Sequence, residues 1–256
     1  MDTRWGRTAV FVPNNHLKEK KIMIVYAHRG ASSYAPENTF ASFYLGWQMG
    51  ANGIETDVQR TKDGVMVLFH DDTLKRIIGI DKRIGDFTYA ELCTMDFGIH
   101  KGERYAGERI VTFEEFVRHF AGKGLHLALE LKEKGYEKQI LDTILPYWPH
   151  DQLIVTSFIW DALIAVRALA PEIRVGYLCA CDEEQLITDM KENGIYQYCP
   201  DGRTLTEEAF ARFRAAGFSI RAWGIADEEV MKRMVNMGVD GMTVNFPDKL
   251  IRYLVK

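Results

Sequence analysis

Short apolar, β-branched runs alternate with amphipathic helical patterns along almost the whole of this chain. The runs have the length and composition of buried parallel strands and lie at residues 22–27, 53–59, 125–131, 153–157, 175–178, 196–199, 219–223 and 241–244. The helical patterns lie at residues 39–49, 112–121, 136–145, 160–169, 183–192, 207–216, 228–237 and 248–254. Eight strand and helix pairs in 256 residues predict an α/β fold, a (β/α)₈ TIM-type barrel rather than an open doubly wound sheet.

Residues that suit helix ends flank these helical patterns. Side chains that can cap a helix N-terminus precede or open the patterns, at Asn38 or Thr39, Thr112, Asp161, Asp182, Thr206 and Asp227. Glycines suited to a left-handed residue follow them, at Gly50, Gly194, Gly217 and Gly238. The chain is therefore expected to form a single domain over residues 1–256, in which residues 1–21 are an N-terminal arm.

One stretch departs from the alternation. Lys62-Asp63-Gly64 predicts a hairpin turn, and the return strand at residues 65–69 delivers His70. Residues 72–110 then show turn signals but no strand and helix rhythm, and are too many for an ordinary loop. We expect a small insertion after the second strand that serves as a lid or sets substrate preference.

Charge and hydropathy narrow the classes of partner. The formal net charge is −4 and the calculated pI is about 6.0, whereas a nucleic-acid-binding chain needs a clustered basic face, so nucleic acid is not expected as a partner. The longest apolar stretches, such as 65–69, are far shorter than a membrane span. Residues 1–21 lack the apolar core of a signal peptide, which predicts a cytoplasmic location.

The cysteines follow no disulfide framework. Cys93, Cys179, Cys181 and Cys199 are few for the length and are expected to be reduced thiols. An alternative is zinc held by the last three of these cysteines, but no fourth ligand has suitable spacing.

Acidic side chains lie near the ends of the second and third predicted barrel strands. Glu55 and Asp57 share one face of a strand by alternation, as do Glu130 and Lys132, and the C-terminal strand ends of a barrel meet at one mouth. Three carboxylates without a nearby thiolate suit Mg²⁺ or Ca²⁺. The alternatives are that the acids form the solvated face of a strand and that Lys132 only pairs with Glu130 rather than contacting a phosphate.

Two histidines also follow strand ends. His28 and His70 can transfer protons near neutral pH, and Arg29 offers a planar cation for a phosphate, so this region holds the groups that phosphodiester chemistry needs. A structural role for each histidine is the alternative. Phe158 and Trp223, near the ends of the fourth and seventh strands, form either an apolar wall for an alcohol or part of the core.

At these residues the sequence resembles the glycerophosphodiester phosphodiesterase family. The shared motifs are AHRGASSYAPENTFASF, GIETDVQRTKDGVMVLFHDDTL, IGDFTYAEL, AGERIVTFEEF, ALELK and the C-terminal GVDG and FPD. The resemblance implies a (β/α)₈ barrel with a small insertion after the His-Asp motif.

The same resemblance implies roles for individual residues. His28 and His70 match the general acid and base, with His28 expected as the base. Residues that match the metal ligands are Glu55, Asp57 and Glu130. Arg29 and Lys132 match phosphate contacts, and Glu37 and Asn38 match an element that shapes the site.

The expected function is metal-dependent hydrolysis of glycerophosphodiesters to glycerol 3-phosphate and an alcohol, within glycerol and lipid metabolism. Water or the neighbouring glycerol hydroxyl is the nucleophile; the sequence leaves both open. Two alternatives remain: a lyase or lysophospholipid-directed enzyme that forms a cyclic phosphate, and a non-catalytic barrel that binds phosphodiesters.

Overall fold

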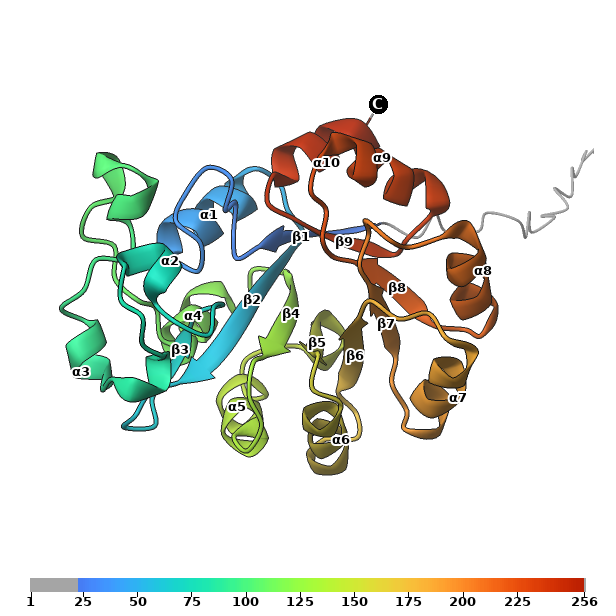
Figure 1. The fold of residues 1–256 in the computed structure, drawn as a ribbon, viewed down its shortest axis with the longest axis horizontal. Coiled ribbons are helices and arrows are strands. Elements are labelled where there is room, and N and C mark those ends of the chain that lie inside the picture. Colours follow the sequence, from blue (N-terminus) through green and yellow to red (C-terminus); the bar gives the residue numbers. More distant parts are fainter. Residues whose placement is uncertain (1–22, 256) are drawn as a thin grey trace, which may run out of the picture.

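The computed structural model describes residues 23–255, so the predicted N-terminal arm at 1–21 lies outside the described residues. Within the described range, eight parallel strands close into a barrel because β1 pairs with both β2 and β9. Figure 1 shows these strands around a common axis with helices outside them. The strands are β1 (Ile24–His28), β2 (Gly53–Arg60), β4 (His126–Leu131), β5 (Leu153–Ser157), β6 (Arg174–Cys179), β7 (Gln197–Pro200), β8 (Ser219–Ala222) and β9 (Gly241–Val244). The predicted TIM barrel is therefore confirmed.

Successive side chains along each barrel strand point alternately toward the outer helices and toward the barrel interior. Ile54 and Val58 of β2 join the large apolar cluster under the helices, together with leucines of β4. Residues between them, such as Glu55 and Asp57, consequently point toward the barrel interior. All but the last residue of β2 are buried, as expected for a parallel strand covered on both faces.

The outer helices follow the predicted patterns closely. They are α1 (Phe40–Gln48), α4 (Phe113–Phe120), α5 (Glu137–Ile144), α6 (Trp160–Leu169), α7 (Glu184–Glu192), α8 (Glu207–Ala215), α9 (Glu228–Met237) and α10 (Pro247–Leu254). The side chains of Thr39, Thr112, Thr206 and Asp227 cap their helices as predicted. The predicted caps Asp161 and Asp182 are wrong.

At these two helices the chain enters differently. The α6 helix begins after Ile159, whose backbone N–H donates to Ser157 Oγ, so Asp161 lies inside the first turn. The α7 helix begins after Glu183, which makes no side-chain cap. The prediction for Asp161 failed because an acid also suits the first turn, where it favours the helix dipole, and that for Asp182 failed because α7 begins one residue later than expected.

Residues 72–110 fold against β3 (Met66–Leu68), which runs antiparallel to β2. They contain two short helices, α2 (Lys75–Ile78) and α3 (Tyr89–Leu92), and the 3₁₀ turns Ile84–Asp86, Ile99–Lys101 and Glu103–Tyr105. A separate apolar cluster lies beneath them, formed by Val67, Phe69, Leu74, Ile77, Ile84, Leu92, Phe97 and Ile110. Figure 1 places this segment on the α1 side of the barrel.

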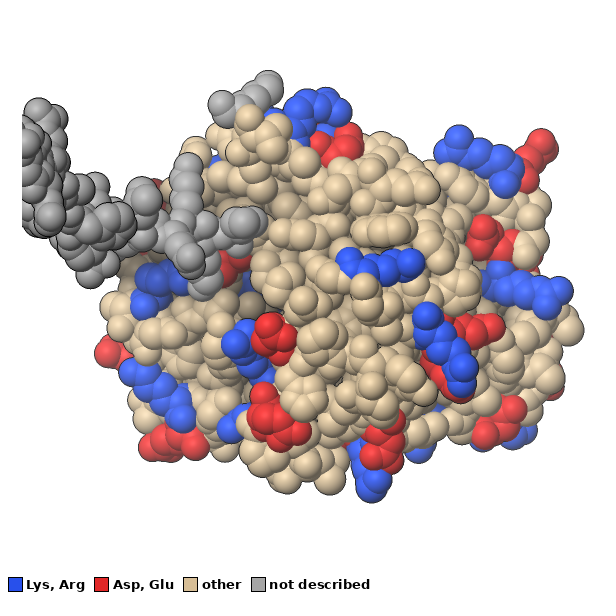
Figure 2. All heavy atoms as spheres, turned by 180° about the vertical axis from the view of Figure 1, so that it is seen from behind, with Lys and Arg blue, Asp and Glu red and all other residues tan. Residues whose placement is uncertain are grey.

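Two further features concern membrane spans and surface charge. None of the helices within residues 23–255 is both long and apolar enough to span a membrane. Figure 2 shows the face seen from behind, where Lys and Arg side chains are scattered among Asp and Glu rather than gathered into one basic region. This mixture agrees with the small net charge of −4.

Candidate active site

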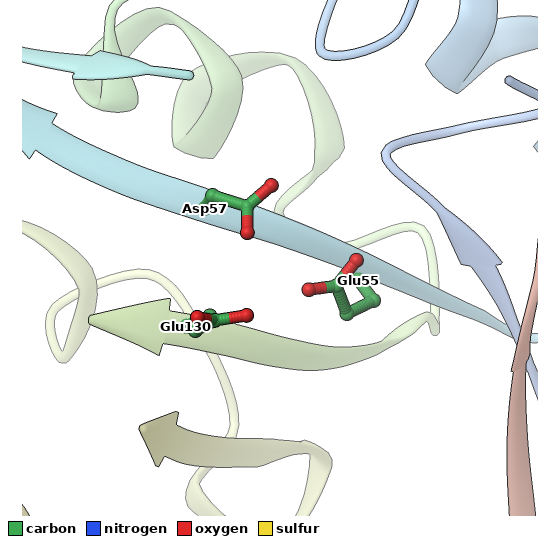
Figure 3. A group of neighbouring side chains, drawn as sticks. All are labelled: Glu55, Asp57 and Glu130. Atoms are coloured by element: carbon green, nitrogen blue, oxygen red, sulfur yellow. The ribbon is translucent and has the colours of Figure 1, made fainter. Parts of the chain in front are cut away.

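Three buried carboxylates converge at the mouth of the barrel. Glu55 and Asp57 project from β2 and Glu130 from the neighbouring β4, and Figure 3 shows the three side chains close together. Each offers an oxygen, and these oxygens lie within 4.8 Å of one another. Since all three side chains are buried, the solvated-face alternative does not hold for them.

Two cations border this group. Lys132 Nζ donates a 2.6 Å hydrogen bond to Glu130 Oε1 and lies 3.1 Å from Asp57 Oδ1. Arg29 Nε lies 3.3 Å from Asp57 Oδ2. Lys132 therefore pairs with Glu130, as one alternative expected, and still borders the carboxylate group at the mouth.

The carboxylates differ in how readily they ionise. Burial raises the pKa of Glu55 well above its usual value, and the negative charges of Asp57 and Glu130 add to the shift. Burial and Asp57 likewise raise the pKa of Glu130 to about 7. Burial also favours neutral Asp57, but Lys132 and Arg29 outweigh it and lower the pKa of that carboxyl. Asp57 is thus the most acidic member.

The donor set fits a hard divalent cation. Glu55 Oε2 is buried and accepts no hydrogen bond from the described residues, and Asp57 Oδ1, also buried and without a hydrogen bond, has the Lys132 ammonium 3.1 Å away as its ion-pair partner. A buried carboxylate oxygen without such a partner is costly, and coordination to a cation would offset this cost. Oxygen ligands alone suit Mg²⁺ or Ca²⁺ better than zinc.

His28 ends β1 beside this group. Its Nδ1–H donates a 2.5 Å hydrogen bond to the amide oxygen of Asn245, and its Nε2 lies 3.7 Å from Glu55 Oε2. Because Asn245 Oδ1 accepts at Nδ1, Nε2 of the neutral ring carries the lone pair. Burial and the Arg29 charge lower the pKa of His28 to about 3, which keeps the ring neutral.

His70 follows β3 and is held differently. Its Nδ1–H donates a 2.8 Å hydrogen bond to Asp71 Oδ1, and about a third of the side chain is exposed. Burial lowers the pKa of His70, while Asp57 and Asp71 oppose this effect by favouring the charged ring. A carboxylate partner therefore distinguishes His70 from His28.

The loop between β1 and α1 carries Arg29 and, through Asn38, holds the Asp57 side chain. Gly30 has a φ of +84°, and a Cβ at this position would lie 2.3 Å from the backbone carbon of Ser42. Arg29 and Asn38 also adopt positive φ, at 55° each. Asn38 accepts a hydrogen bond from Thr56 and donates one of 3.1 Å to Asp57 Oδ2, so it fixes the Asp57 carboxylate.

Two aromatic side chains follow the C-terminal ends of β5 and β8. Phe158, which follows β5, is 47% exposed and packs edge to face on Trp223, with ring centroids 5.3 Å apart. Trp223 Nε1 donates to the carbonyl oxygen of Cys199. The exposure of Phe158 argues against the alternative that it belongs to the core.

The cysteines take no part in this arrangement. All four are free thiols, as predicted. Within residues 23–255, the carboxylates at the mouth are the only group of three or more potential metal ligands, so the zinc alternative at Cys179, Cys181 and Cys199 finds no support.

Two contacts of this site were not predicted. Asn245 follows the final strand, so the rule that polar residues at C-terminal strand ends line the mouth could have found it. Arg76 binds both Glu37 and Asp71 from within residues 72–110. No periodicity in that segment signals such a contact.

Comparisons with known proteins agree with this geometry. The family model for the glycerophosphoryl diester phosphodiesterase family matches residues 28–249. A glycerophosphodiester phosphodiesterase from Caldanaerobacter subterraneus subsp. tengcongensis is 33% identical over 91% of this chain and 98% of its own length. One from Bacillus subtilis is 30% identical over 91% of this chain and 87% of its own length.

Solved structures show the same similarity. An Oleispira antarctica phosphodiesterase in complex with the product sn-glycerol-3-phosphate superposes with a TM-score of 0.84 and 32% identity, over 91% of this chain and 96% of that one. A glycerophosphodiester phosphodiesterase from Thermotoga maritima gives 0.75 and 27% identity, over 91% and 98%.

Proposed function

Because the chain belongs to the glycerophosphoryl diester phosphodiesterase family, we propose that it hydrolyses glycerophosphodiesters to glycerol 3-phosphate and an alcohol. The observation that carries this proposal is the meeting of three buried carboxylates, two cations and two histidines at one end of the barrel. The product bound to the Oleispira antarctica phosphodiesterase supports the glycerol phosphate half of the substrate. The free cysteines suit a reducing compartment, so a cytoplasmic location is part of the proposal.

Glu55, Asp57 and Glu130 would hold a divalent cation, Mg²⁺ or Ca²⁺. Bound there, the cation would stabilise negative charge on the phosphate oxygens. Arg29 and Lys132 border the same carboxylates and would contact the phosphate from the protein side. Together these positive charges would stabilise the transition state, because negative charge is spread over the phosphate oxygens there.

His28 serves as the general base in this proposal. The Asn245 amide oxygen accepts the proton on Nδ1, so Nε2 is free to remove a proton from the nucleophile. The nucleophile is either water or the neighbouring glycerol hydroxyl. Attack by the hydroxyl would produce a cyclic phosphate, as in the lyase alternative.

His70 serves as the general acid. Asp71 accepts the Nδ1 proton and favours the imidazolium, and the opposite nitrogen would protonate the leaving alkoxide. A phosphodiester anion in the site would raise the pKa of His70 from its lowered value, because nearby negative charge favours the charged ring. Phe158 and Trp223 would form an apolar wall beside the substrate.

A substrate panel tests the function. Glycerophosphocholine, glycerophosphoethanolamine and glycerophosphoglycerol are offered with Mg²⁺, Mn²⁺ or Ca²⁺ after chelation, and products are followed by phosphorus NMR. We expect chelation to abolish turnover and Mg²⁺ or Ca²⁺ to restore it, with glycerol 3-phosphate as the final product. Accumulation of a cyclic phosphate would favour the lyase.

A pair of variants checks the carboxylates. Glu55→Gln should lose metal binding and turnover, whereas Glu137→Gln changes an equally buried carboxyl outside the site and should retain both. Full turnover after exhaustive chelation, with no metal found by elemental analysis, would contradict the proposed metal dependence. Absence of turnover on every substrate would contradict the function itself.

A further inference from the structure

Arg76, on α2 of the segment 72–110, binds two carboxylates at once. Its Nη1 and Nη2 each donate a 2.7 Å hydrogen bond to Glu37. Its Nε and Nη2 donate hydrogen bonds of 2.6 and 3.0 Å to Asp71. Such forked pairing fixes the planes of both carboxylates relative to the guanidinium, which a single ammonium group cannot do.

Each of these carboxylates also contacts a candidate site residue. Asp71 Oδ1 accepts the Nδ1 proton of His70 at 2.8 Å. Glu37 Oε1 accepts a 2.9 Å hydrogen bond from Arg29 Nη1. Arg76 is therefore one hydrogen-bonded partner away from both the proposed proton donor and a proposed phosphate contact.

The charges of the two carboxylates support this arrangement. Burial alone would favour neutral Glu37, but the hydrogen bonds from Arg76 and the charge of Arg29 lower the pKa of Glu37. Burial likewise opposes ionisation of Asp71, and hydrogen bonds from Arg76 and His70 lower its pKa. Both acids are ionised, so both hold their partners by charge-assisted hydrogen bonds.

Other contacts fasten the same segment to the loop that carries Arg29 and Glu37. Lys101 Nζ donates to the carbonyl oxygen of Ser32 at 2.7 Å, and the Tyr105 hydroxyl donates to the carbonyl oxygen of Tyr34 at 2.8 Å. The segment thus contacts the β1–α1 loop at several points. Among the residues that make these contacts, Arg76 is the one whose carboxylate partners bind both His70 and Arg29.

We propose that Arg76 is a positioning residue for the hydrolysis: it orients His70 through Asp71 and Arg29 through Glu37. This inference rests on the proposed function. It assigns residues 72–110 a part in the chemistry, since their fold sets the position of Arg76.

The test compares Arg76→Met with Arg76→Lys and with Lys75→Met. Lys75 lies on the same short helix, is mostly exposed and pairs with Asp81, away from the site, so it is the matched control. Activity is measured on glycerophosphocholine, which has an alkyl leaving group, and on bis(4-nitrophenyl) phosphate, whose leaving group needs no proton. Circular dichroism establishes that each variant is folded, and Arg76→Gln replaces Arg76→Met if the latter does not fold.

We expect Arg76→Met to lower kcat on the alkyl substrate by roughly 10- to 100-fold, as for other residues that orient catalytic groups. The loss should be smaller on the aryl substrate, because the contribution of His70 is absent there. Arg76→Lys should recover only part of the activity, and Lys75→Met should stay within about twofold of the original chain.

A second measurement does not depend on turnover. Without the Arg76 cation, the Asp71 carboxylate attracts the His70 proton more strongly, so the pKa of His70 should rise in Arg76→Met and not in Lys75→Met. Histidine NMR titration reports this change. A rise in this pKa without a loss of kcat would show that Arg76 acts only on the charge of the Asp71–His70 pair and would overturn the positioning role.

The outcomes separate the two proposals. If the original chain hydrolyses glycerophosphodiesters and folded Arg76→Met matches Lys75→Met in kcat and in the pKa of His70, the inference about Arg76 is wrong and the function stands. If the original chain hydrolyses none of them, the function fails, and the role of Arg76 in it fails as well.

Discussion

His28 and His70 are held at the same ring atom by chemically different partners. A neutral amide oxygen at Asn245 accepts from His28 Nδ1, whereas the Asp71 carboxylate accepts from His70 Nδ1. A carboxylate favours the charged imidazolium, and an amide does so much less. This difference supports the assignment of His28 as base and His70 as acid.

Removal of each histidine tests that assignment. His28→Ala and His70→Ala should each lower kcat on glycerophosphocholine by roughly 10²- to 10⁴-fold, the usual contribution of a positioned proton-transfer group. On bis(4-nitrophenyl) phosphate the His70→Ala loss should nearly vanish, because a good leaving group departs without a proton. The measurement is kcat for each variant on both substrates.

His119→Ala is a suitable control, since His119 lies on the exposed face of α4, where Tyr44 contacts its ring. Recovery of His28→Ala alone on the aryl substrate would reverse the two roles. Equal losses on both substrates for both variants would reject any division between them.

Sequence rules found some residues of the candidate site and missed others. Glu55, Asp57, Glu130 and His28 were found because alternation and strand ends constrain side-chain direction in any parallel barrel. Arg76 was not found, since its position depends on the irregular path of residues 72–110. The chemical roles of these residues remain predictions.

At the scale of elements, the β1–α1 loop depends on a glycine that no other residue can replace. Gly30→Ala should abolish most activity and destabilise the chain, because its Cβ would meet the Ser42 backbone at 2.3 Å. Gly79→Ala is the matched control: its φ is +80°, but no atom lies within 4 Å of the position its Cβ would take. The control should lose only about 1–2 kcal/mol of unfolding free energy.

Thermal unfolding and kcat of the two glycine variants provide the comparison. If Gly30→Ala were as stable and active as Gly79→Ala, the close approach of this loop to α1 would not matter for the site.

Residues 72–110 are held by their own apolar cluster, and Leu92 of α3 is fully buried in it. Leu92→Ala should cost about 2–5 kcal/mol, the usual range for a buried leucine. The loss should be local, so hydrogen exchange should accelerate within 72–110 more than in the barrel strands. Leu169→Ala, at a side chain that is half exposed on α6, is the control and should change little.

Uniform acceleration of exchange across the barrel in Leu92→Ala would contradict this independence. The short helices α2 and α3 themselves were not predicted. Helices of four residues carry too little periodicity to be recognised, and tertiary packing determines them.

At the scale of the whole molecule, the carboxylate group links metal binding to pH. Burial raises the pKa of Glu130 to about 7 and that of Glu55 well above its usual value, so protons compete with a cation for both carboxylates in the metal-free fold. A cation must displace these protons, and each pH unit below the pKa of Glu130 should weaken its affinity by up to about tenfold. The stabilisation that Mg²⁺ gives should therefore grow from pH 6 to pH 8.

Scanning calorimetry of chelated protein with and without Mg²⁺ measures this difference. The increment in Tm is the useful quantity, because the histidines themselves also raise the stability of the fold as pH rises, with or without metal. Their folded pKa values are lowered, so their neutral forms favour folding as pH rises toward 6.5. An increment that is the same at both pH values, or larger at pH 6, would contradict the linkage.

The barrel as a whole was the most predictable level. The hydrophobic period and the order of strands and helices alone indicated eight units. The bounds of the barrel strands and outer helices differ from the predicted ones by at most two residues. This success follows because each unit must bury its apolar face against its neighbours, and few topologies allow that for eight such units.

The candidate site is unevenly distributed around the barrel. The strands β1, β2 and β4 are adjacent. Together with the residues that follow β1, β3 and β4, they supply the carboxylates, the cations and both histidines. The loops after β5 and β8 contribute Phe158 and Trp223. For protein engineering, this leaves an arc of loops that can be randomised without touching the groups proposed for bond cleavage. Libraries confined to the loops after β5–β8 should yield altered head-group selectivity at a high frequency of active clones.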